Sequence, residues 1–401
     1  MDFSFIQNIV KPLNTKIVML VMDGLGGLAK TPANFTELET AFTPNLDDLA
    51  KKGICGLHQP IDVGITPGSG SAHLGLFGYD PVKYQIGRGV LSALGINFKL
   101  KQNDIAVRGN FCTVDKNSKV TDRRAGRIST VKNRKLCKIL NSIHIKGIEI
   151  CVKTIKEHRF LLVLRGQGLS ADISDTDPQT VGVSPLKAEG TNNKAKKTLK
   201  IINTFISEAR KKLTNHHPAN MILLRGFAKL PEWPVMANVF QINAAAIAAY
   251  PMYRGVARLA GMEILKTEDD INDEFAILEK NWSEYDFFFL HVKATDSAAE
   301  DGNFERKVKV IEKVDRQIPR LMHLLPDVVI VTGDHSTPAL FGMHSWHPVP
   351  MILWSKSCLP DNVKHFGERA CIAGSLGPRF PGKDIIPLAM ANAQRFAKFN
   401  A

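Results

Sequence analysis

The chain has 401 residues, of which 44% are hydrophobic, and a formal net charge of +13. This length exceeds one comfortable hydrophobic core, so it predicts a core domain with a second domain or a large insertion. No apolar run approaches the ~20 residues that a membrane-spanning helix needs, and the N-terminal segment lacks the basic start and long apolar stretch of a secretory signal. We therefore expect a cytoplasmic protein that does not bind membranes.

The basic residues are dispersed, apart from residues 122–127 (DRRAGR) and the lysine-rich stretch at residues 192–200. No aromatic residues alternate with them as they do in an RNA-binding strand, so we expect no nucleic-acid partner. The charge is compatible with a basic surface or with an anionic substrate. The six cysteines have no CxxC or zinc-finger spacing, as expected where thiols stay reduced.

Three segments in the first third of the chain are typical of an α/β core. Residues 16–27 (KIVMLVMDGLGG) predict a buried strand followed by a glycine-rich turn. Residues 43–53 (TPNLDDLAKKG) open with Thr-Pro and close with glycine, which predicts a short helix. Residues 66–81 (TPGSGSAHLGLFGYDP) predict a glycine-rich turn that opens an apolar helix.

The pattern changes in the middle of the chain and then returns. From residue 109 to residue 233, short β-like runs alternate with basic and polar segments, which predicts an inserted α+β cap domain. The last third again alternates strand and helix patterns, including one long amphipathic helix at residues 304–325. The prediction is a doubly wound α/β core formed by residues 1–108 and 234–401, interrupted by the insertion.

Acidic residues follow three of the predicted strands. LVMDG ends near Asp23, FFFLHVKATD at Asp296, and VVIVTGDH at Asp334 and His335. A single aspartate at such a place is usually a turn former, but the carboxyl ends of parallel strands gather ligands at one edge of the sheet. Together with His344, these side chains provide what two adjacent divalent cations require.

Ser69 lies among small residues in PGSGSAH, where its hydroxyl is exposed at the start of a predicted helix. Beside metal ions, serine is a candidate nucleophile that carries a phosphoryl group, and the helix N-terminus favours that anion. The alternative is a simple N-cap, which this segment alone favours. His73 follows one helical turn later and either contacts substrate or stabilises the turn.

Taken in order, eight motifs resemble those of the archaeal-type cofactor-independent phosphoglycerate mutases of the alkaline phosphatase superfamily. They are MDGLGG, TPNLD, PGSGSAHLGLFGYDP, GRG, DRRAGR, HR followed by LRGQGLS, DHSTP and HSWHPVP, and they extend from about residue 16 to the C-terminus. The resemblance implies an alkaline-phosphatase-like core with a cap. It also implies interconversion of 3-phosphoglycerate and 2-phosphoglycerate in glycolysis and gluconeogenesis, with a phosphoserine intermediate, two divalent cations and no 2,3-bisphosphoglycerate.

The same resemblance implies roles for individual residues. Ser69 becomes the nucleophile, with His73 as a catalytic neighbour. One metal is held by Asp23, Ser69, Asp334 and His335, and the other by Asp296 and His344. The side chains expected to bind phosphoglycerate are Asp122, Arg123, Arg124, Arg127, Arg88, Arg159 and Lys293.

Two positions depart from the family pattern. Most relatives carry a histidine four residues after the aspartate of TDxxxH, whereas this chain has Glu300. We expect Glu300 to be a ligand of the second metal, and a carboxylate there favours magnesium or manganese over zinc. His291 and Asp301 are the alternative substitutes. Gly70 stands where an acidic residue is expected after the nucleophile.

Two other interpretations stay open. A metal-dependent phosphatase, phosphodiesterase or phosphotransferase of the same superfamily would share the core and differ in the fate of the phosphoryl group. A catalytically silent binding protein is the other alternative, and only the Glu300 departure favours it. The remaining ligand set argues against it, because buried carboxylates are costly to retain without metal. An arylsulfatase is disfavoured because no Cys/Ser-x-Pro-x-Arg segment replaces PGSGS. The sequence leaves a homo-oligomer open.

Overall fold

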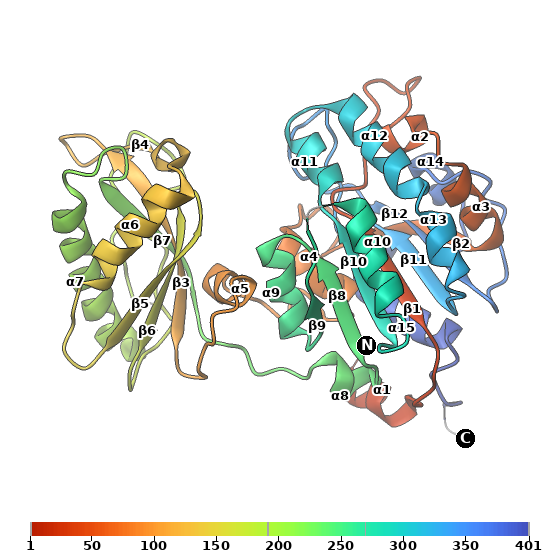
Figure 1. The fold of residues 1–401 in the computed structure, drawn as a ribbon, viewed down its shortest axis with the longest axis horizontal. Coiled ribbons are helices and arrows are strands. Elements are labelled where there is room, and N and C mark those ends of the chain that lie inside the picture. The colour runs from red at the N-terminus through yellow and green to blue at the C-terminus, as the bar shows by residue number, and fades with distance from the viewer. Residues whose placement is uncertain (1, 191, 269, 400–401) are drawn as a thin grey trace. The chain divides into compact units, whose positions relative to one another are not determined.

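The computed structural model describes residues 2–190, 192–268 and 270–399, which form two compact units. The first unit is discontinuous and comprises Met1–Gln85 and Trp233–Ala401, and the second is the insertion Ile86–Glu232 (Figure 1). The first junction therefore lies earlier in the chain than the position after residue 108 expected from the sequence. The change of pattern at residue 109 falls inside one continuous strand, β3 (Ile105–Val114).

The first unit is built on an eight-stranded sheet with the order β13-β2-β12-β11-β1-β10-β8-β9. Strand β12 runs antiparallel to both of its neighbours, whereas the other pairs are parallel, so the sheet is mixed. The strands are β1 (Ile17–Met22), β2 (Ile54–Gln59), β8 (Ala244–Ala248), β9 (Glu263–Leu265), β10 (Phe287–Val292), β11 (Val328–Thr332), β12 (Val349–Ser355) and β13 (Gly377–Pro381).

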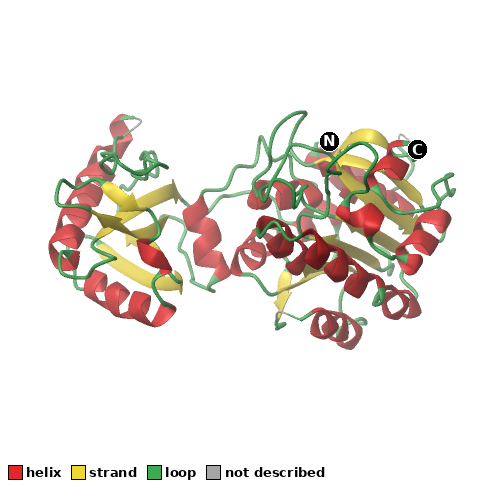
Figure 2. Cartoon of the chain, turned by 90° about the horizontal axis from the view of Figure 1, so that it is seen from above, coloured by secondary structure: helices red, strands yellow, loops and turns green. Residues whose placement is uncertain are grey.

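Helices cover both faces of this sheet (Figure 2). The central strands carry apolar side chains on both faces, so each face needs a layer that shields it from water. In β10, Phe288 and Leu290 join the core beneath α10, whereas Phe289 contacts the ring of Phe77 at the end of α4. The helices are α1 (Phe3–Ile9), α2 (Glu37–Thr40), α3 (Pro44–Lys52), α4 (Ser69–Leu76), α8 (Met236–Phe240), α9 (Pro251–Leu259), α10 (Ile271–Lys280), α11 (Ala294–Glu300), α12 (Phe304–Asp315), α13 (Ile318–His323), α14 (Glu368–Ile372), α15 (Ile385–Asn392) and the 3₁₀ turn η3 (Gly382–Asp384).

Two helix predictions have opposite outcomes. The helix expected at residues 43–53 is confirmed as α3, which ends with Gly53 as its C-cap. The single helix expected at residues 304–325 is wrong, since the chain forms α12 and α13 with a break between them. Pro319 stands in the first turn of α13, where its missing N–H costs nothing, whereas inside a continuous helix it would remove a hydrogen bond. Among the described residues, no helix is long and apolar enough to cross a membrane.

The second unit is an antiparallel sheet with the order β4-β3-β6-β5, to which β7 adds beside β3. Apolar residues of α6 and α7 pack on it in one core, and α5 contacts β3. The elements are α5 (Arg88–Gly95), β3, β4 (Val120–Asp122), η1 (Ala125–Arg127), α6 (Thr130–Asn141), β5 (Glu149–Lys156), β6 (Arg159–Arg165), η2 (Asn193–Ala195), α7 (Lys196–Leu213) and β7 (Met221–Ala228).

Candidate metal centre

Three adjacent parallel strands bring the expected carboxylates to one edge of the sheet. Strand β1 pairs with β10 on one side and with β11 on the other. Asp23 follows β1 directly, and Asp334 stands two residues after β11. The sequence placed Asp296 at the end of a strand, but β10 already ends at Val292. Asp296 lies in the first turn of the following helix, α11. All three aspartates are fully buried.

One group of potential ligands consists of Asp23, Asp334 and His335, each offering an atom within 4.8 Å of the others. Nε2 of His335 lies 3.4 Å from Asp23 Oδ1, 3.2 Å from Asp334 Oδ2 and 3.2 Å from Ser69 Oγ. Both carboxylate oxygens of Asp23 and Oδ2 of Asp334 have no hydrogen-bond partner among the described residues. Buried carboxylates in this condition are costly, and a divalent cation would compensate them. The residues therefore fit a metal ion.

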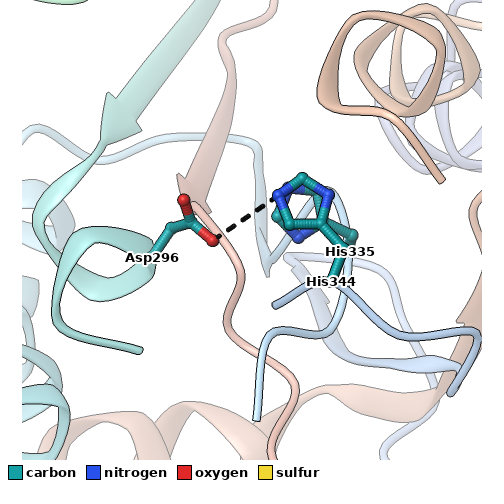
Figure 3. Close-up of side chains that lie close together, drawn as sticks. All are labelled: Asp296, His335 and His344. Atoms are coloured by element: carbon teal, nitrogen blue, oxygen red, sulfur yellow. Dashed lines mark ion pairs between the residues drawn. The ribbon is translucent and has the colours of Figure 1, made fainter. Parts of the chain in front are cut away.

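A second group consists of Asp296, His335 and His344 (Figure 3). Nε2 of His344 lies 3.9 Å from Asp296 Oδ1, and the rings of His335 and His344 stack with their centroids 3.6 Å apart. Nδ1 of His344 lies 3.0 Å from the carbonyl oxygen of Pro67, to which it must donate, so Nε2 carries the free lone pair. His335 thus belongs to both groups, which the sequence did not indicate.

Lys293 lies between the two groups. Its Nζ is 3.1 Å from Asp23 Oδ2 and makes a short hydrogen bond with Asp296 Oδ2. Burial opposes the charge of Lys293, but Asp23 and Asp296 outweigh it and raise the pKa of the ammonium. Burial, followed by the charge of Asp23, raises the pKa of Asp334 well above its usual range. Burial opposes the ionisation of Asp23 as well, but the charge of Lys293 and the contact with His291 outweigh it and lower the pKa of that carboxyl well below its usual range.

The local structure bears on the N-cap interpretation of Ser69 and leaves its role as a nucleophile a prediction. The N-cap of α4 is Gly68, and Ser69 is the first helical residue without a capping hydrogen bond, so the N-cap interpretation is wrong. The Ser69 hydroxyl instead contacts His335. His73 donates from Nδ1 to the carbonyl oxygen of Ser69, 2.8 Å away, and this hydrogen bond stabilises the first turn of α4. Burial, followed by the nearby His291, lowers the pKa of His73 to about 3, so it is neutral at pH 7.

Glu300 lies in neither group, although it stands four residues after Asp296 on the same helix. The residue keeps an exposed surface, but the protein atoms around its carboxyl displace part of its water, and this desolvation, followed by the charge of Asp296, raises its pKa. Of the two alternative substitutes, Asp301 is paired with Arg306 at 2.8 Å. His291 is buried beside Asp23, with its Nε2 3.4 Å from Asp23 Oδ2.

In the inserted unit, two of the expected substrate ligands already have intramolecular partners. Arg123 makes a bidentate ion pair with the buried Asp177, with N–O distances of 2.9 and 2.8 Å. Asp122 accepts hydrogen bonds from the backbone N–H groups of Arg124 and Gly126, at 2.7 and 2.5 Å. Both side chains therefore shape the DRRAGR turn.

Three of the other arginines, Arg124, Arg127 and Arg159, carry charges that act on His158, a residue to which the sequence analysis gave no role. His158 is buried, and burial followed by the charges of Arg159, Arg124 and Arg127 lowers its pKa to about 4. The backbone of Arg88 packs against Gly226, which follows Arg225 in the chain. Arg225 is a second residue that the sequence analysis did not name. Arg225 lies 3.4 Å from Asp177. The signal for His158 was the HR dipeptide, and that for Arg225 was the charge ending the apolar run MILLRG.

Removing the Arg123 side chain tests its structural role. We expect Arg123→Met to lower the free energy of unfolding by about 2 kcal/mol, because Asp177 loses its main charged partner while it stays buried. Arg124→Met is the matched control, since Arg124 is exposed and its loss uncovers no buried charge. Chemical denaturation of both variants measures the difference. Equal stability of the two variants would contradict the structural role of Arg123.

Known proteins resemble this chain over its whole length. A protein-family model described as "2,3-bisphosphoglycerate-independent phosphoglycerate mutase" matches residues 50–220. A "Probable 2,3-bisphosphoglycerate-independent phosphoglycerate mutase" of Aquifex aeolicus is 48% identical, over 99% of each chain. One of the same name from Thermus thermophilus is 44% identical, over 100% of this chain and 99% of its own.

Solved structures agree with this relationship. A protein of Pyrococcus horikoshii superposes with a TM-score of 0.81 at 30% identity, over 97% of this chain and all of its own. The "Cofactor-Independent Phosphoglycerate mutase" of Thermoplasma acidophilum superposes with a TM-score of 0.72 at 30% identity, over 94% of this chain and all of its own. The chain belongs to the archaeal-type 2,3-bisphosphoglycerate-independent phosphoglycerate mutases, a family of isomerases.

Proposed function

We propose that this chain interconverts 3-phosphoglycerate and 2-phosphoglycerate through a phosphoserine at Ser69, with two divalent cations held beyond β1, β10 and β11. The observation that carries the proposal is the position of the Ser69 hydroxyl, 3.2 Å from Nε2 of His335 and beside carboxylate oxygens that have no hydrogen-bond partner among the described residues. A serine placed among such ligands can be activated as a nucleophile.

The ligands divide between two ions. Asp23, Ser69, Asp334 and His335 would hold one ion, and Asp296, Glu300 and His344 would hold the other. Cations held by these residues would lower the pKa of the serine hydroxyl and neutralise the phosphoryl oxygens. The inclusion of Glu300 makes the second ligand set richer in carboxylate, which favours magnesium or manganese over zinc.

In the reaction, the oxygen of Ser69 attacks phosphorus and the P–O bond to the substrate breaks, while the proton lost by the Ser69 hydroxyl is balanced by the one that the released glycerate oxygen takes up. Glycerate then reorients, and its other hydroxyl attacks the phosphorus of the phosphoserine. The bond from phosphorus to the Ser69 oxygen breaks, and the proton lost by the attacking hydroxyl balances the one that restores the Ser69 hydroxyl. The N–H groups at the start of α4 and the ammonium of Lys293 favour the transferred anion.

The carboxylate and phosphate of the substrate need cationic partners as well. Arg124, Arg127 and Arg159, which gather around His158, and Arg88 of the inserted unit are suited to this task because guanidinium groups bind such oxygens in pairs. Arg123 and Asp122 would act indirectly, by holding the turn that presents Arg124 and Arg127. Exclusion of water from the phosphoserine would separate the mutase from a phosphatase.

An assay with metal-free protein tests this proposal. We expect conversion of 3-phosphoglycerate to 2-phosphoglycerate without 2,3-bisphosphoglycerate after addition of magnesium or manganese, with little free phosphate. Ser69→Ala should lower kcat by more than about 1000-fold, because the nucleophile is lost. Ser71→Ala, two residues along the same helix, is the matched control and should stay active. Phosphate release without isomerisation would favour a phosphatase, and an active Ser69→Ala would refute the phosphoserine.

The role of Glu300 is tested separately. We expect Glu300→Ala to raise the manganese concentration needed for half-maximal activity by about 10-fold or more, because one ligand of the second ion is lost. Glu300→His should restore binding and shift the preference towards zinc. Glu305→Ala removes an exposed carboxylate five residues further on and serves as the control. An unchanged metal requirement in Glu300→Ala would rule out the ligand role.

A further inference from the structure

We propose that Thr337 is a positioning residue that selects the metal-binding ring nitrogen of His335 and links the two groups of metal ligands through its hydroxyl. Thr337 is itself neither a ligand nor a nucleophile in the scheme above. The inference rests on the proposed function in one respect, namely that the two groups hold metal ions.

The hydrogen bonds of the Thr337 hydroxyl have only one consistent direction. Its Oγ1 lies 2.7 Å from Asp296 Oδ1 and 2.9 Å from His335 Nδ1, and the residue is fully buried. A hydroxyl has one proton, and an ionised carboxylate can only accept. The hydroxyl therefore donates to Asp296 and accepts from His335. It follows that Nδ1 of His335 carries the ring proton.

This arrangement leaves the lone pair of His335 on Nε2, where it is needed. Nε2 is the atom that lies 3.2 to 3.4 Å from Ser69, Asp334 and Asp23. Only an unprotonated ring nitrogen can bind a metal, and the bond made by the other nitrogen decides which one is unprotonated. The hydroxyl of Thr337 thus orients His335, which belongs to both groups, and Asp296, which belongs to the second.

The surrounding backbone is shaped around this hydroxyl. Gly24 follows Asp23 directly and has a φ of 62°, in the left-handed region. A Cβ atom on Gly24 would lie 2.6 Å from Thr337 Oγ1 and 2.7 Å from Asp296 Oδ1. A side chain at this position would displace both atoms, so glycine leaves the room that the hydrogen bond between Thr337 and Asp296 requires.

Thr337 is in turn held by a buried lysine. Nζ of Lys307 donates to the carbonyl oxygens of Thr337 and Gly26, at 2.9 and 3.1 Å, and Glu37 Oε1 lies 3.9 Å away. The N–H of Thr337 also donates to Gly26, at 2.9 Å. The loops that follow β1 and β11 are therefore tied together at Thr337. Since they carry Asp23 and Asp334, the same contacts fix the distance between these ligands.

Two substitutions separate the hydroxyl from the bulk of the side chain. Thr337→Val keeps the branched shape and removes the hydroxyl, whereas Thr337→Ser keeps the hydroxyl and removes the methyl group. Titration calorimetry of metal-free protein with Mn²⁺ measures the affinity directly. Loss of a residue that orients a metal ligand typically weakens binding about 10- to 100-fold, and we expect this in Thr337→Val. Thr337→Ser should bind like the unsubstituted chain.

The outcomes distinguish the two proposals. Undiminished binding by Thr337→Val, or an equal loss in Thr337→Ser, would overturn the role of the hydroxyl. An unsubstituted chain that binds no Mn²⁺ would instead refute the metal centre. Should Thr337→Val fail to fold, ¹⁵N NMR of the histidine rings in the metal-free unsubstituted chain tests the same point, with His335→Gln for assignment. We expect a protonated Nδ1 and an unprotonated Nε2, and the opposite tautomer would overturn the inference.

Discussion

The burial of three carboxylates beyond neighbouring parallel strands is the constraint on which the rest of this molecule depends. Asp23, Asp296 and Asp334 are withdrawn from water, and among the described residues both oxygens of Asp23 and one of Asp334 have no hydrogen-bond partner. Such burial costs several kcal/mol per charge unless cations compensate it. Lys293 supplies one positive charge, and the imidazoles add hydrogen-bonding capacity. Under the proposed function, cations bound to the folded chain would offset this cost.

The strand order explains why this geometry is reproducible. Parallel pairing of β1 with both β10 and β11 places their carboxyl ends at one level. Strand pairing alone does not aim side chains, however, and the contacts around Thr337 and Lys307 supply that additional precision. A buried lysine bonded to two backbone carbonyl oxygens is a costly way to join loops. Its presence beneath the ligand loops is understandable if small displacements there weaken metal binding.

Much of the centre could be predicted from the sequence because its residues follow short apolar runs. Asp23 and Asp334 were expected at strand ends, and the turn before Ser69 was expected to open a helix. These features depend on local periodicity and turn chemistry. The break before Pro319 was equally local and was missed because the apolar pattern continues across it. The double membership of His335 was not predictable, because it depends on how two separate loops pack together.

Long-range partners were the other part that sequence reasoning could not supply. Arg123 was expected to bind substrate, yet its guanidinium is engaged by Asp177, 54 residues away. The sequence analysis put the start of the insertion inside β3, because the residue composition changes there. The strand itself continues without a break across that position. His158 was quoted from the sequence only as part of the HR motif, without a role of its own, because the burial and the arginine charges that lower its pKa come from folding. In each case contacts between segments distant in the sequence decided the outcome.

The central claim, that this buried carboxylate centre is completed by divalent cations, is tested most directly by thermal unfolding of the metal-free chain with increasing Mn²⁺. A ligand that binds only the folded state stabilises it by about 2.7 kcal/mol at a hundred times its Kd, so the account predicts a Tm that rises continuously with Mn²⁺ and returns to its starting value after chelation. A Tm that does not change up to millimolar Mn²⁺, in protein shown to be folded and metal-free, would contradict it.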